Sequence, residues 1–228
     1  ALSMAACMAA SVTACGGSKP AETTAAATEA ETTAAESAAE ESSAEETKAA
    51  ADIETVTPGK LTVATSPDFA PYEFYAIGED GTPKLAGFDM DLAQYIADYL
   101  GLEVEVVTVD FDGVISELQT KSVDLGMAGL SPDEKRMGIM DFSDLYYMGG
   151  QSLVTVKDNA EKYNSFEAIN KPDVSVGAQV GSIQMDLANE NSPEADIVGL
   201  PKVTDIISEL LTGKMDAAYI ETDVAKSY

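Results

Sequence analysis

Between residues 58 and 228, short hydrophobic runs rich in β-branched residues alternate with segments whose apolar positions recur at helical spacing. The clearest helix follows Gly87 and runs to about Leu100, where Gly101 ends it. The order predicted for the first part is strand, loop, strand, helix, strand, helix, strand, which implies parallel strands joined by crossover helices. A second cycle of the same kind starts after Gly149-Gly150. The pattern therefore predicts an α/β protein.

The remaining predicted elements are short and regularly spaced. Strands are predicted at 61–65, 104–109, 123–127, 174–178, 196–199 and 217–220, and helices from Asp112 to near Lys121, at 183–189 and at 202–211. Ligands bind beyond the carboxyl ends of parallel strands, and the loops 66–74 and 128–136 both follow strands directly. The Gly149-Gly150 pair is interpreted either as a hinge between two lobes or as a strand bulge.

The loop that contains Arg136 carries the strongest chemical signal. This arginine is the only one in the chain, and it follows a small-residue turn (Ala128-Gly129), Ser131 and Pro132, which is placed to start a helical turn. A planar guanidinium beside backbone N–H groups suits a carboxylate, so the loop predicts a pocket for the carboxylate of a small ligand. Loss of such an arginine should leave the ligand-free stability unchanged. The alternative is a surface turn whose arginine pairs with a neighbouring acid such as Asp133.

Composition narrows the range of functions. The formal charge is −27, from 40 acidic and 13 basic residues, which disfavours nucleic acid and anionic lipid surfaces as partners. The chain contains no histidine, so Ser-His-Asp and Cys-His catalysis are excluded and the commonest zinc ligand is missing. No metal and no cofactor are predicted.

The N-terminal part resembles an export signal followed by a tether. Residues 1–15 form an apolar, small-residue run without an initiator methionine, and Val12-Thr-Ala-Cys15 matches the bacterial lipobox. We expect a truncated lipoprotein signal with lipidation of Cys15; an ordinary cleaved signal or a plain apolar end are the alternatives. Residues 16–57, rich in Ala, Thr, Ser and Glu, predict a disordered acidic tether.

Five motifs in one order resemble the solute-binding proteins of bacterial amino-acid ABC transporters, the periplasmic-binding-protein-like family 3. The motifs are Ser66-Pro-Asp-Phe-Ala-Pro-Tyr-Glu73, Gly87-Phe-Asp-Met-Asp-Leu92, Leu130-Ser-Pro-Asp-Glu-Lys-Arg136 with Asp141-Phe-Ser143, Gln179-Val-Gly-Ser-Ile-Gln184 and Asp216-Ala-Ala-Tyr-Ile-Glu221. The resemblance implies a two-lobed, type II periplasmic-binding-protein-like fold, with lobe 1 at 58–150 and an incomplete lobe 2 at 151–228. The family's closing segment, about a quarter of a typical member, has no counterpart here, so we expect a fragment or a gene cut at both ends.

The resemblance also assigns roles to individual residues. It implies that Arg136 holds the ligand α-carboxylate, helped by Ser131, the Gly129 backbone and Ser182 of the other lobe. Glu221 matches the acid that receives the α-ammonium. The aromatic position against the ligand side chain is occupied by Phe69. The last ligand position is Ser66, where members that favour basic amino acids often have an aspartate.

These roles predict an extracytoplasmic solute-binding lipoprotein that captures an amino acid and delivers it to ABC permease subunits. We expect a monomer that is anchored to the cell membrane through Cys15. One alternative is an enzyme that resembles cyclohexadienyl dehydratase, with Glu73 or Glu221 as the acid. The other is the ligand-sensing domain of a receptor. Which amino acid is bound is left open.

Several other side chains are expected to have ordinary structural roles. We interpret Glu73 and the acids from Asp89 to Asp91 as solvated surface groups. Tyr72, Tyr146 and Tyr147 are predicted to pack in the core or at the hinge rather than to contact a ligand.

Overall fold

The computed structural model describes residues 53–228. The expected lipoprotein signal at 1–15 with Cys15, and the tether expected at 16–57 as far as residue 52, lie outside the described residues. Within the described part, no helix is both long and apolar enough to cross a membrane.

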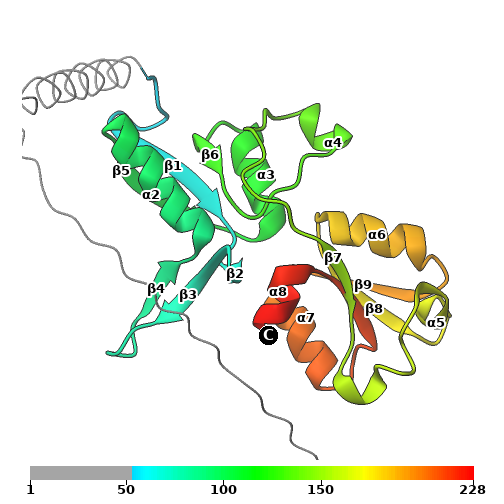
Figure 1. Ribbon diagram of the computed structural model, residues 1–228. Helices are drawn as coiled ribbons and strands as arrows, with labels where there is room; N and C mark the ends of the chain where they lie inside the picture. The colour runs from blue at the N-terminus through cyan, green and yellow to red at the C-terminus, as the bar shows by residue number, and fades with distance from the viewer. Residues whose placement is uncertain (1–52) are drawn as a thin grey trace, which may run out of the picture. The chain divides into compact units, whose positions relative to one another are not determined.

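The first sheet is parallel and has β1 (Lys60–Thr65) at its centre, between β5 (Glu103–Thr108) and β6 (Leu125–Gly126). Two crossover helices connect these strands, α2 (Phe88–Leu100) and α3 (Phe111–Gln119) (Figure 1). Strands that alternate with crossover helices run parallel, and the helices cover both faces of the sheet.

The side chains of β1 alternate between two packed layers. Leu61 and Val63 pack with the α2 alanines Ala93 and Ala97, whereas Ala64 packs with the side chains of α3. The period of two along a strand thus places one helix on each face of this sheet.

A small antiparallel sheet follows β1 and consists of β2 (Asp68–Phe69), β3 (Glu73–Ile77) and β4 (Pro83–Ala86). The sequence pattern did not predict β4, because Pro83 and Lys84 are exposed and the strand has only four residues. Gly87 then turns the chain into α2 with φ 127°, and an added Cβ would overlap the carbonyl oxygen of Tyr72. Only glycine therefore fits at this close approach.

The second sheet has the strand order β7-β10-β8-β9. Its strands are β7 (Gln151–Val154), β8 (Ser175–Gln179), β9 (Asp196–Leu200) and β10 (Ala217–Glu221), and only β7 runs antiparallel to its neighbour. Helix α6 (Ile183–Asn191) covers one face, and α7 (Val203–Leu211) covers the other together with α8 (Thr222–Ser227) (Figure 1).

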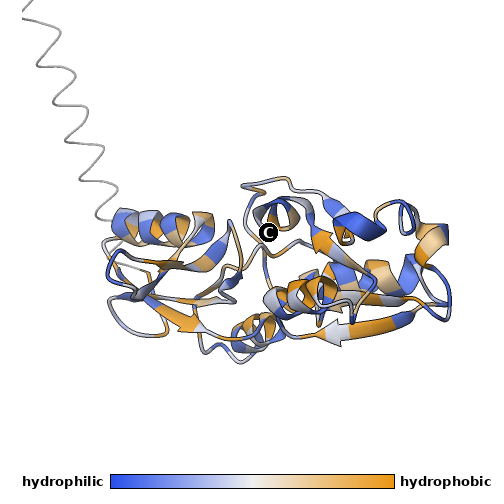
Figure 2. Ribbon diagram, turned by 90° about the horizontal axis from the view of Figure 1, so that it is seen from below, coloured by the Kyte–Doolittle hydropathy of each residue, from blue (hydrophilic) through white to orange (hydrophobic). Residues whose placement is uncertain are grey.

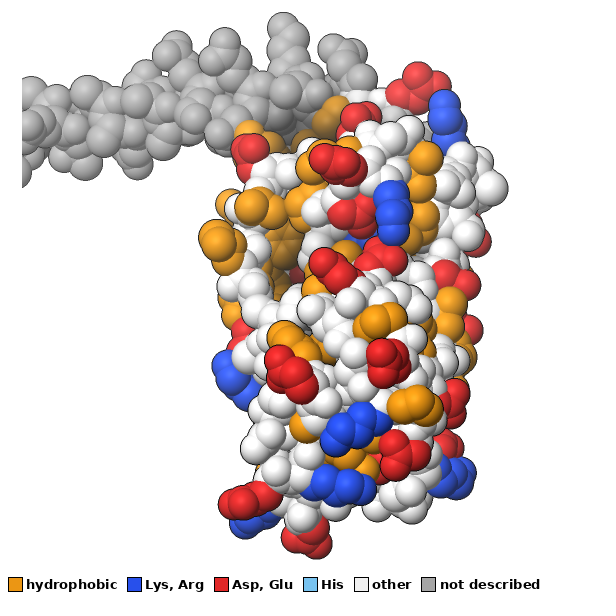
Figure 3. All heavy atoms as spheres, turned by 90° about the vertical axis from the view of Figure 1, so that its right-hand side faces the viewer, with side chains coloured by type: hydrophobic (Ala, Val, Ile, Leu, Met, Phe, Trp, Pro, Cys, Tyr) orange, Lys and Arg blue, Asp and Glu red, His pale blue; other side chains and the backbone are white. Residues whose placement is uncertain are grey.

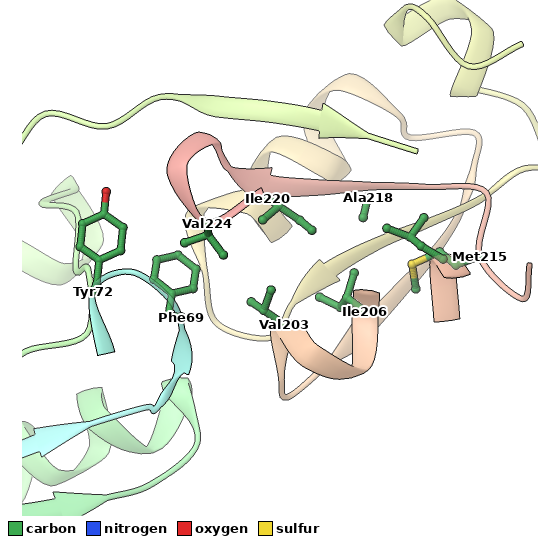
Figure 4. Close-up of a cluster of buried hydrophobic side chains, with 9 residues drawn as sticks. Phe69, Tyr72, Val203, Ile206, Met215, Ala218, Ile220 and Val224 are labelled. Atoms are coloured by element: carbon green, nitrogen blue, oxygen red, sulfur yellow. The ribbon is translucent and has the colours of Figure 1, made fainter. Parts of the chain in front are cut away.

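Strand β10 is buried along its whole length. Ala217 and Tyr219 point into the cluster on the α6 side, and Ala218 and Ile220 point into the cluster on the α7 side. Figure 4 shows that second cluster, in which Phe69 of β2 lies beside Val203 of α7 and Val224 of α8, and Tyr72 lies next to Phe69 at the edge. Its full buried membership is Phe69, Tyr72, Val203, Ile206, Leu210, Met215, Ala218, Ile220 and Val224.

Some helix boundaries differ from those predicted. The N-cap position of α3 is Asp110, and Asp112 lies in the first turn instead of capping the helix. Pro132 precedes α4 (Glu134–Met137), whose N-cap is Asp133, so the proline does not start the helix. The cap side chain at Asp133 accepts from a backbone N–H group and thereby fixes the start.

Other differences concern short elements. Only Leu125–Gly126 of the strand predicted at 123–127 is paired. Residues 139–150 form no strand, so Gly149-Gly150 precedes β7 and does not interrupt a strand. The 3₁₀ turn η1 (Lys157–Asn159) and helix α5 (Phe166–Ile169) were not predicted, since three or four residues give no period to read.

The distribution of polar and charged side chains agrees with the acidic composition of the chain. Most helices carry both hydrophilic and hydrophobic residues, as expected for helices with one buried side (Figure 2). Figure 3 shows acidic side chains spread over one face, interspersed with fewer basic ones.

Candidate ligand-binding site

Arg136 lies in α4, and its guanidinium is held on three sides. Nε forms an ion pair with Asp133 at 3.2 Å, Nη1 donates to the Ser131 carbonyl oxygen at 2.8 Å, and Nη2 donates to the Gly181 carbonyl oxygen at 3.0 Å. The residue is only 6% exposed, so the alternative of a surface turn is wrong, although the pairing with Asp133 is present. Asp133 also accepts the backbone N–H of Arg136 at 2.8 Å and thus couples the side chain to the start of the helix.

These bonds leave part of the guanidinium unused. Of its five N–H groups, three take part in the contacts above, which leaves one on Nη1 and one on Nη2. Burial lowers the pKa of Arg136, and Asp133 and Asp186 act in the opposite direction. An arginine stays protonated in either case. Its cation also lies 5.6 Å from the ring centre of Phe111.

Glu221, the last residue of β10, uses only one of its carboxylate oxygens for structure. Oε2 accepts the backbone N–H groups of Asp223 and Val224 at 2.7 and 2.8 Å and so caps α8. Oε1 is buried and has no hydrogen-bond partner among the described residues. An acceptor of this kind is costly to bury unless a donor reaches it.

Arg136 and Glu221 line the same small cavity, which has a volume of about 20 Å³. Room of this size holds about one water molecule. The aromatic rings of Phe69 and Phe111 form its apolar walls. The full lining is Phe69, Phe111, Gly129, Ser131, Arg136, Gln151, Gln179, Ile183, Gln184 and Glu221. Two opposite charges and flat apolar walls in one cavity match the chemistry of a zwitterion with a carbon side chain.

A larger cavity of about 290 Å³ lies next to the small one, because Gly129, Ser131, Gln151 and Glu221 line both. Tyr72 and the segment 140–147 form much of its wall, but Arg136 and Phe69 do not reach it. The small cavity is therefore the candidate site in spite of its size, because both charged residues line it.

Phe69 and Gly129 depend on each other. The Phe69 ring is buried and stacks on Tyr72, with ring centres 5.6 Å apart. Gly129 has φ 56°, and an added Cβ would lie 2.9 Å from the Phe69 ring. Glycine is therefore needed for the conformation and for the close approach of the ring. Its backbone N–H donates to Asp89 at 2.9 Å, so this amide is already engaged.

Of the three serines predicted to contact the ligand, Ser131 lines both cavities, but Ser66 and Ser182 line neither. Ser66 is buried and donates to Asp68 Oδ1 at 2.7 Å. Ser182 caps α6: its hydroxyl donates to the Gln179 carbonyl oxygen at 2.7 Å and accepts from the Met185 N–H at 3.2 Å. Both hydroxyls shape the loops around the site.

The sequence patterns missed several residues of the site. Phe111, Gln151, Ile183 and the two glutamines of the Gln179–Gln184 motif line the small cavity. The Gln184 amide donates to Gln151 Oε1 at 2.7 Å, a pairing over 33 residues that no local pattern signals. Within residues 53–228, no cluster of three potential metal-ligating side chains occurs.

Two acids interpreted as solvated are in fact buried. Glu73 and Asp89 are each 0% exposed, whereas Asp91 is exposed as expected. Burial raises the pKa of both carboxyls, and for Glu73 the nearby Asp89 and Asp68 raise the pKa further. The prediction was wrong because an acid at a helix start, such as Asp89, or at a strand start, such as Glu73, looks the same in sequence whether it faces water or a neighbouring segment.

The three tyrosines expected in the core or at the hinge differ in their exposure. Tyr72 is buried in the core, as predicted, but it also lines the larger cavity. Tyr146 and Tyr147 are 44% and 46% exposed and pack against Phe88. The hydroxyl of Tyr146 donates to Asp89 Oδ1 at 3.0 Å.

Contacts between segments far apart in the sequence lie around the small cavity. Asp68 Oδ2 accepts the Val203 N–H at 2.5 Å and the Gln179 amide at 3.3 Å. Lys135 pairs with Asp186 at 3.1 Å. With the Arg136–Gly181 bond, these contacts close the loops over the cavity.

Comparison with known proteins agrees with this architecture. The sequence model of the bacterial extracellular solute-binding proteins, family 3, matches residues 61–202. The arginine-binding extracellular protein ArtP of Bacillus subtilis is 36% identical over 171 residues, which cover 74% of this chain and 64% of that protein. The histidine-binding periplasmic protein of Salmonella typhimurium is 30% identical over 172 residues (75% and 63%). Cyclohexadienyl dehydratase of Pseudomonas aeruginosa is 29% identical over 158 residues (69% and 58%). The chain thus spans less than two-thirds of the length of these relatives.

Solved structures give the same result. An amino acid ABC transporter substrate-binding protein from Streptococcus pneumoniae, bound to L-arginine, superposes with a TM-score of 0.71 at 38% identity, covering 75% of this chain and 70% of that chain. The ancestral amino acid-binding protein AncCDT-1, a precursor of cyclohexadienyl dehydratase, gives 0.70 at 38% identity (75% and 73%). The predicted type II periplasmic-binding-protein-like fold is confirmed. The chain belongs to the bacterial extracellular solute-binding proteins, family 3.

Proposed function

We propose that this protein captures an α-amino acid outside the cytoplasm and delivers it to the permease subunits of an ABC transporter. The observation that carries the proposal is the small cavity lined by Arg136 and Glu221, where two N–H groups of the guanidinium and one oxygen of the carboxylate have no hydrogen-bond partner among residues 53–228. The relatives named above support an amino acid as the ligand, since their names specify arginine and histidine.

In the proposed complex, the α-carboxylate accepts the free N–H groups on Nη1 and Nη2 of Arg136. The α-ammonium donates to Glu221 Oε1, and the side-chain carbons lie between Phe69 and Phe111. Gly129 and Ser131 belong to the loop that carries Arg136, and both line the small cavity beside the ligand carboxylate. Ser66 and Ser182 contact the ligand only after their hydroxyls turn from their present acceptors.

Entry of an amino acid requires the loops to separate, because the cavity has room for about one water molecule. We propose that lobe 1 (58–150) and lobe 2 (151–228) move apart at the Gly149-Gly150 segment and close on the ligand. Closure is then favoured by contacts that only the closed state makes, such as those to Glu221.

The proposal extends to the location of the protein. Lipidation of Cys15 anchors the chain to the cell membrane, and residues 16–57 act as the tether. The protein works there as a monomer that docks on its permease. Membership of an extracellular family supports the location.

A dehydratase is the second candidate, supported by the cyclohexadienyl dehydratase among the relatives. Such a reaction needs an acid beside the leaving hydroxyl group. Glu221 lines the small cavity, whereas Glu73 lines neither cavity, so Glu221 is the residue that this alternative requires.

The test combines a ligand screen with a variant of Glu221. Thermal shift with the twenty amino acids should identify a ligand, and calorimetry then gives its Kd for the unchanged chain, Glu221→Gln and the exposed control Glu190→Gln. The glutamine at 221 keeps an oxygen for the α8 cap but presents an NH₂ group to the ammonium. We expect Kd to rise at least about tenfold, or about 1.4 kcal/mol, while the ligand-free melting temperature stays nearly constant.

Two outcomes would contradict the proposal. One is the absence of a shift with every amino acid; the other is an unchanged Kd for Glu221→Gln. Turnover of prephenate or arogenate by the unchanged chain, lost in the same variant, would favour the enzyme instead.

A further inference from the structure

Asp89 connects two segments that border the candidate site. Its side chain is completely buried in the first turn of α2. Oδ2 accepts the backbone N–H of Gly129 at 2.9 Å, and Oδ1 accepts the hydroxyl of Tyr146 at 3.0 Å. Gly129 belongs to the loop that carries Arg136, and both Gly129 and Tyr146 line cavities that Asp89 itself does not reach.

Glu73 lies beside Asp89 and has an unusual environment. It is 0% exposed, and no N–H or hydroxyl group of residues 53–228 donates to its carboxyl oxygens, so its polar neighbours are the carboxylates of Asp89 and Asp68. Two backbone hydrogen bonds connect the segments that carry these acids: the Asp89 N–H donates to the Tyr72 carbonyl oxygen at 2.9 Å, and the Phe88 N–H donates to the Pro71 carbonyl oxygen at 3.0 Å. The acids are therefore held together by the fold.

Two adjacent buried carboxylates are tolerated when they share a proton, since ionisation of both would place like charges in a low dielectric. The groups that face Glu73 are Asp68 of β2, Asp89 of α2 and Tyr146 of the segment after α4; none of these three is basic. Burial is the main cause of the raised pKa of Glu73, followed by the charges of Asp89 and Asp68. Asp89 receives two donors and is the better place for the charge, so the proton resides on Glu73.

We propose that Glu73 and Asp89 form a one-proton pair that positions the ligand-binding loop through Gly129 and Tyr146, and so makes amino-acid capture dependent on pH. The inference rests on the proposed function. Both acids act as positioning residues, because neither contacts the cavities. When the pH rises and the shared proton is lost, two carboxylates repel each other behind the loop. The Asp89–Gly129 bond is then weakened, and the loop leaves its binding conformation.

The experiment compares the unchanged 228-residue chain with Glu73→Gln, Asp89→Asn and Asp91→Asn. Asp91 is the matched control, since it lies in the same helical turn but is exposed. L-arginine is the probe, and Kd is measured by calorimetry from pH 5 to pH 7, between the usual pKa values of an α-carboxyl group (about 3.5) and an α-amino group (about 7.8), so that the charges of arginine itself change little. Hydrogen exchange at the Gly129 amide is followed in parallel without any amino acid.

The unchanged chain and Asp91→Asn should lose affinity by up to about tenfold per pH unit above the pKa of the pair. At pH 5, Glu73→Gln should bind L-arginine with the same affinity as the unchanged chain. It should keep this affinity as the pH rises, because the glutamine amide donates to Asp89 without titrating. Asp89→Asn has one acceptor for two donors, so its affinity should be about tenfold lower at every pH and its Gly129 amide should exchange faster.

The two proposals fail in different ways. If L-arginine and the other amino acids do not bind the unchanged chain at any pH, the proposed function is wrong, and the Gly129 exchange rates still test the pair. If affinity and Gly129 exchange in Glu73→Gln follow the same pH profile as in the unchanged chain, the pair does not position the loop.

Discussion

Replacement of Arg136 tests the structural and the binding role of one side chain together. Arg136→Ala removes two hydrogen bonds from a charged donor, to Ser131 and Gly181, and the ion pair with Asp133. Bonds to charged groups contribute about 1.5–3 kcal/mol each, but the loss is offset in part because a buried cation no longer has to be desolvated. We expect the ligand-free chain to lose about 2–3 kcal/mol of unfolding free energy. The sequence alone predicted no loss, because it showed no partner for the guanidinium except a neighbouring acid.

The effect on binding should exceed the effect on folding. In the proposed complex the alanine variant loses both N–H groups that hold the α-carboxylate, and the carboxylate then stays desolvated without a partner. Affinity should fall at least about a hundredfold, or about 2.7 kcal/mol. Arg136→Lys keeps the charge but not the fork, so it should lose about tenfold in affinity and about 1 kcal/mol in stability.

Urea unfolding gives the stability of each ligand-free variant, and calorimetry at a concentration where the chain is folded gives the affinity. Lys84→Ala is the control, because Lys84 is exposed and its removal changes the net charge by the same amount. An unchanged Kd in Arg136→Ala would refute the proposed role, whatever the stability. A loss of affinity without any loss of stability would instead refute the three contacts described above.

Two further predictions concern residues near Glu221 and Asp89. An added Cβ at Gly149 would overlap Glu221 Oε1 and lie 3.3 Å from the Tyr72 hydroxyl, so Gly149→Ala should weaken amino-acid binding at least about tenfold by calorimetry. Gly138→Ala, whose nearest neighbour is the Lys135 carbonyl oxygen at 3.3 Å, should bind normally, and equal affinities for the two would contradict this account. Because the pKa of Glu73 is raised by folding, its contribution to stability is complete below the ordinary value of 4.5 and is lost as the pH rises towards the raised pKa. The unfolding free energy of the unchanged chain should therefore fall, relative to Glu73→Gln, by up to about 1.4 kcal/mol per pH unit in urea titrations, and parallel curves would show that Glu73 does not titrate.

The elements with a clear period were predictable from sequence. Helix α2 was expected from Gly87 to Leu100 and is observed from Phe88 to Leu100, with Gly101 in the left-handed conformation. Strand β10 was expected at 217–220, directly before Glu221, and is observed from Ala217 to Glu221. In these cases the local pattern and the tertiary contacts favour the same structure.

The contacts between distant segments were not predictable. The Asp68 carboxylate bonds to Val203 over 135 residues, and Asp89 bonds to Gly129 over 40. A carboxylate that bonds to a backbone amide far along the chain has no local signature, so buried acids were interpreted as solvated ones. Likewise, Arg136 was recognised from its motif, but its bond to Gly181 depends on how the two loops meet.

The two oxygens of the Glu221 carboxylate have different roles, and this limits how the site can be redesigned. Since Oε2 caps α8, a substitution that removes both side-chain oxygens also removes the cap, whereas glutamine keeps an oxygen for it. A substitution at Glu221 that removes its oxygens, made to accept ligands without an ammonium group, should therefore also destabilise α8. Phe69 and Phe111 line the cavity but do not cap a helix. Substitutions meant to change which ligand side chain is preferred are therefore better made at these two residues.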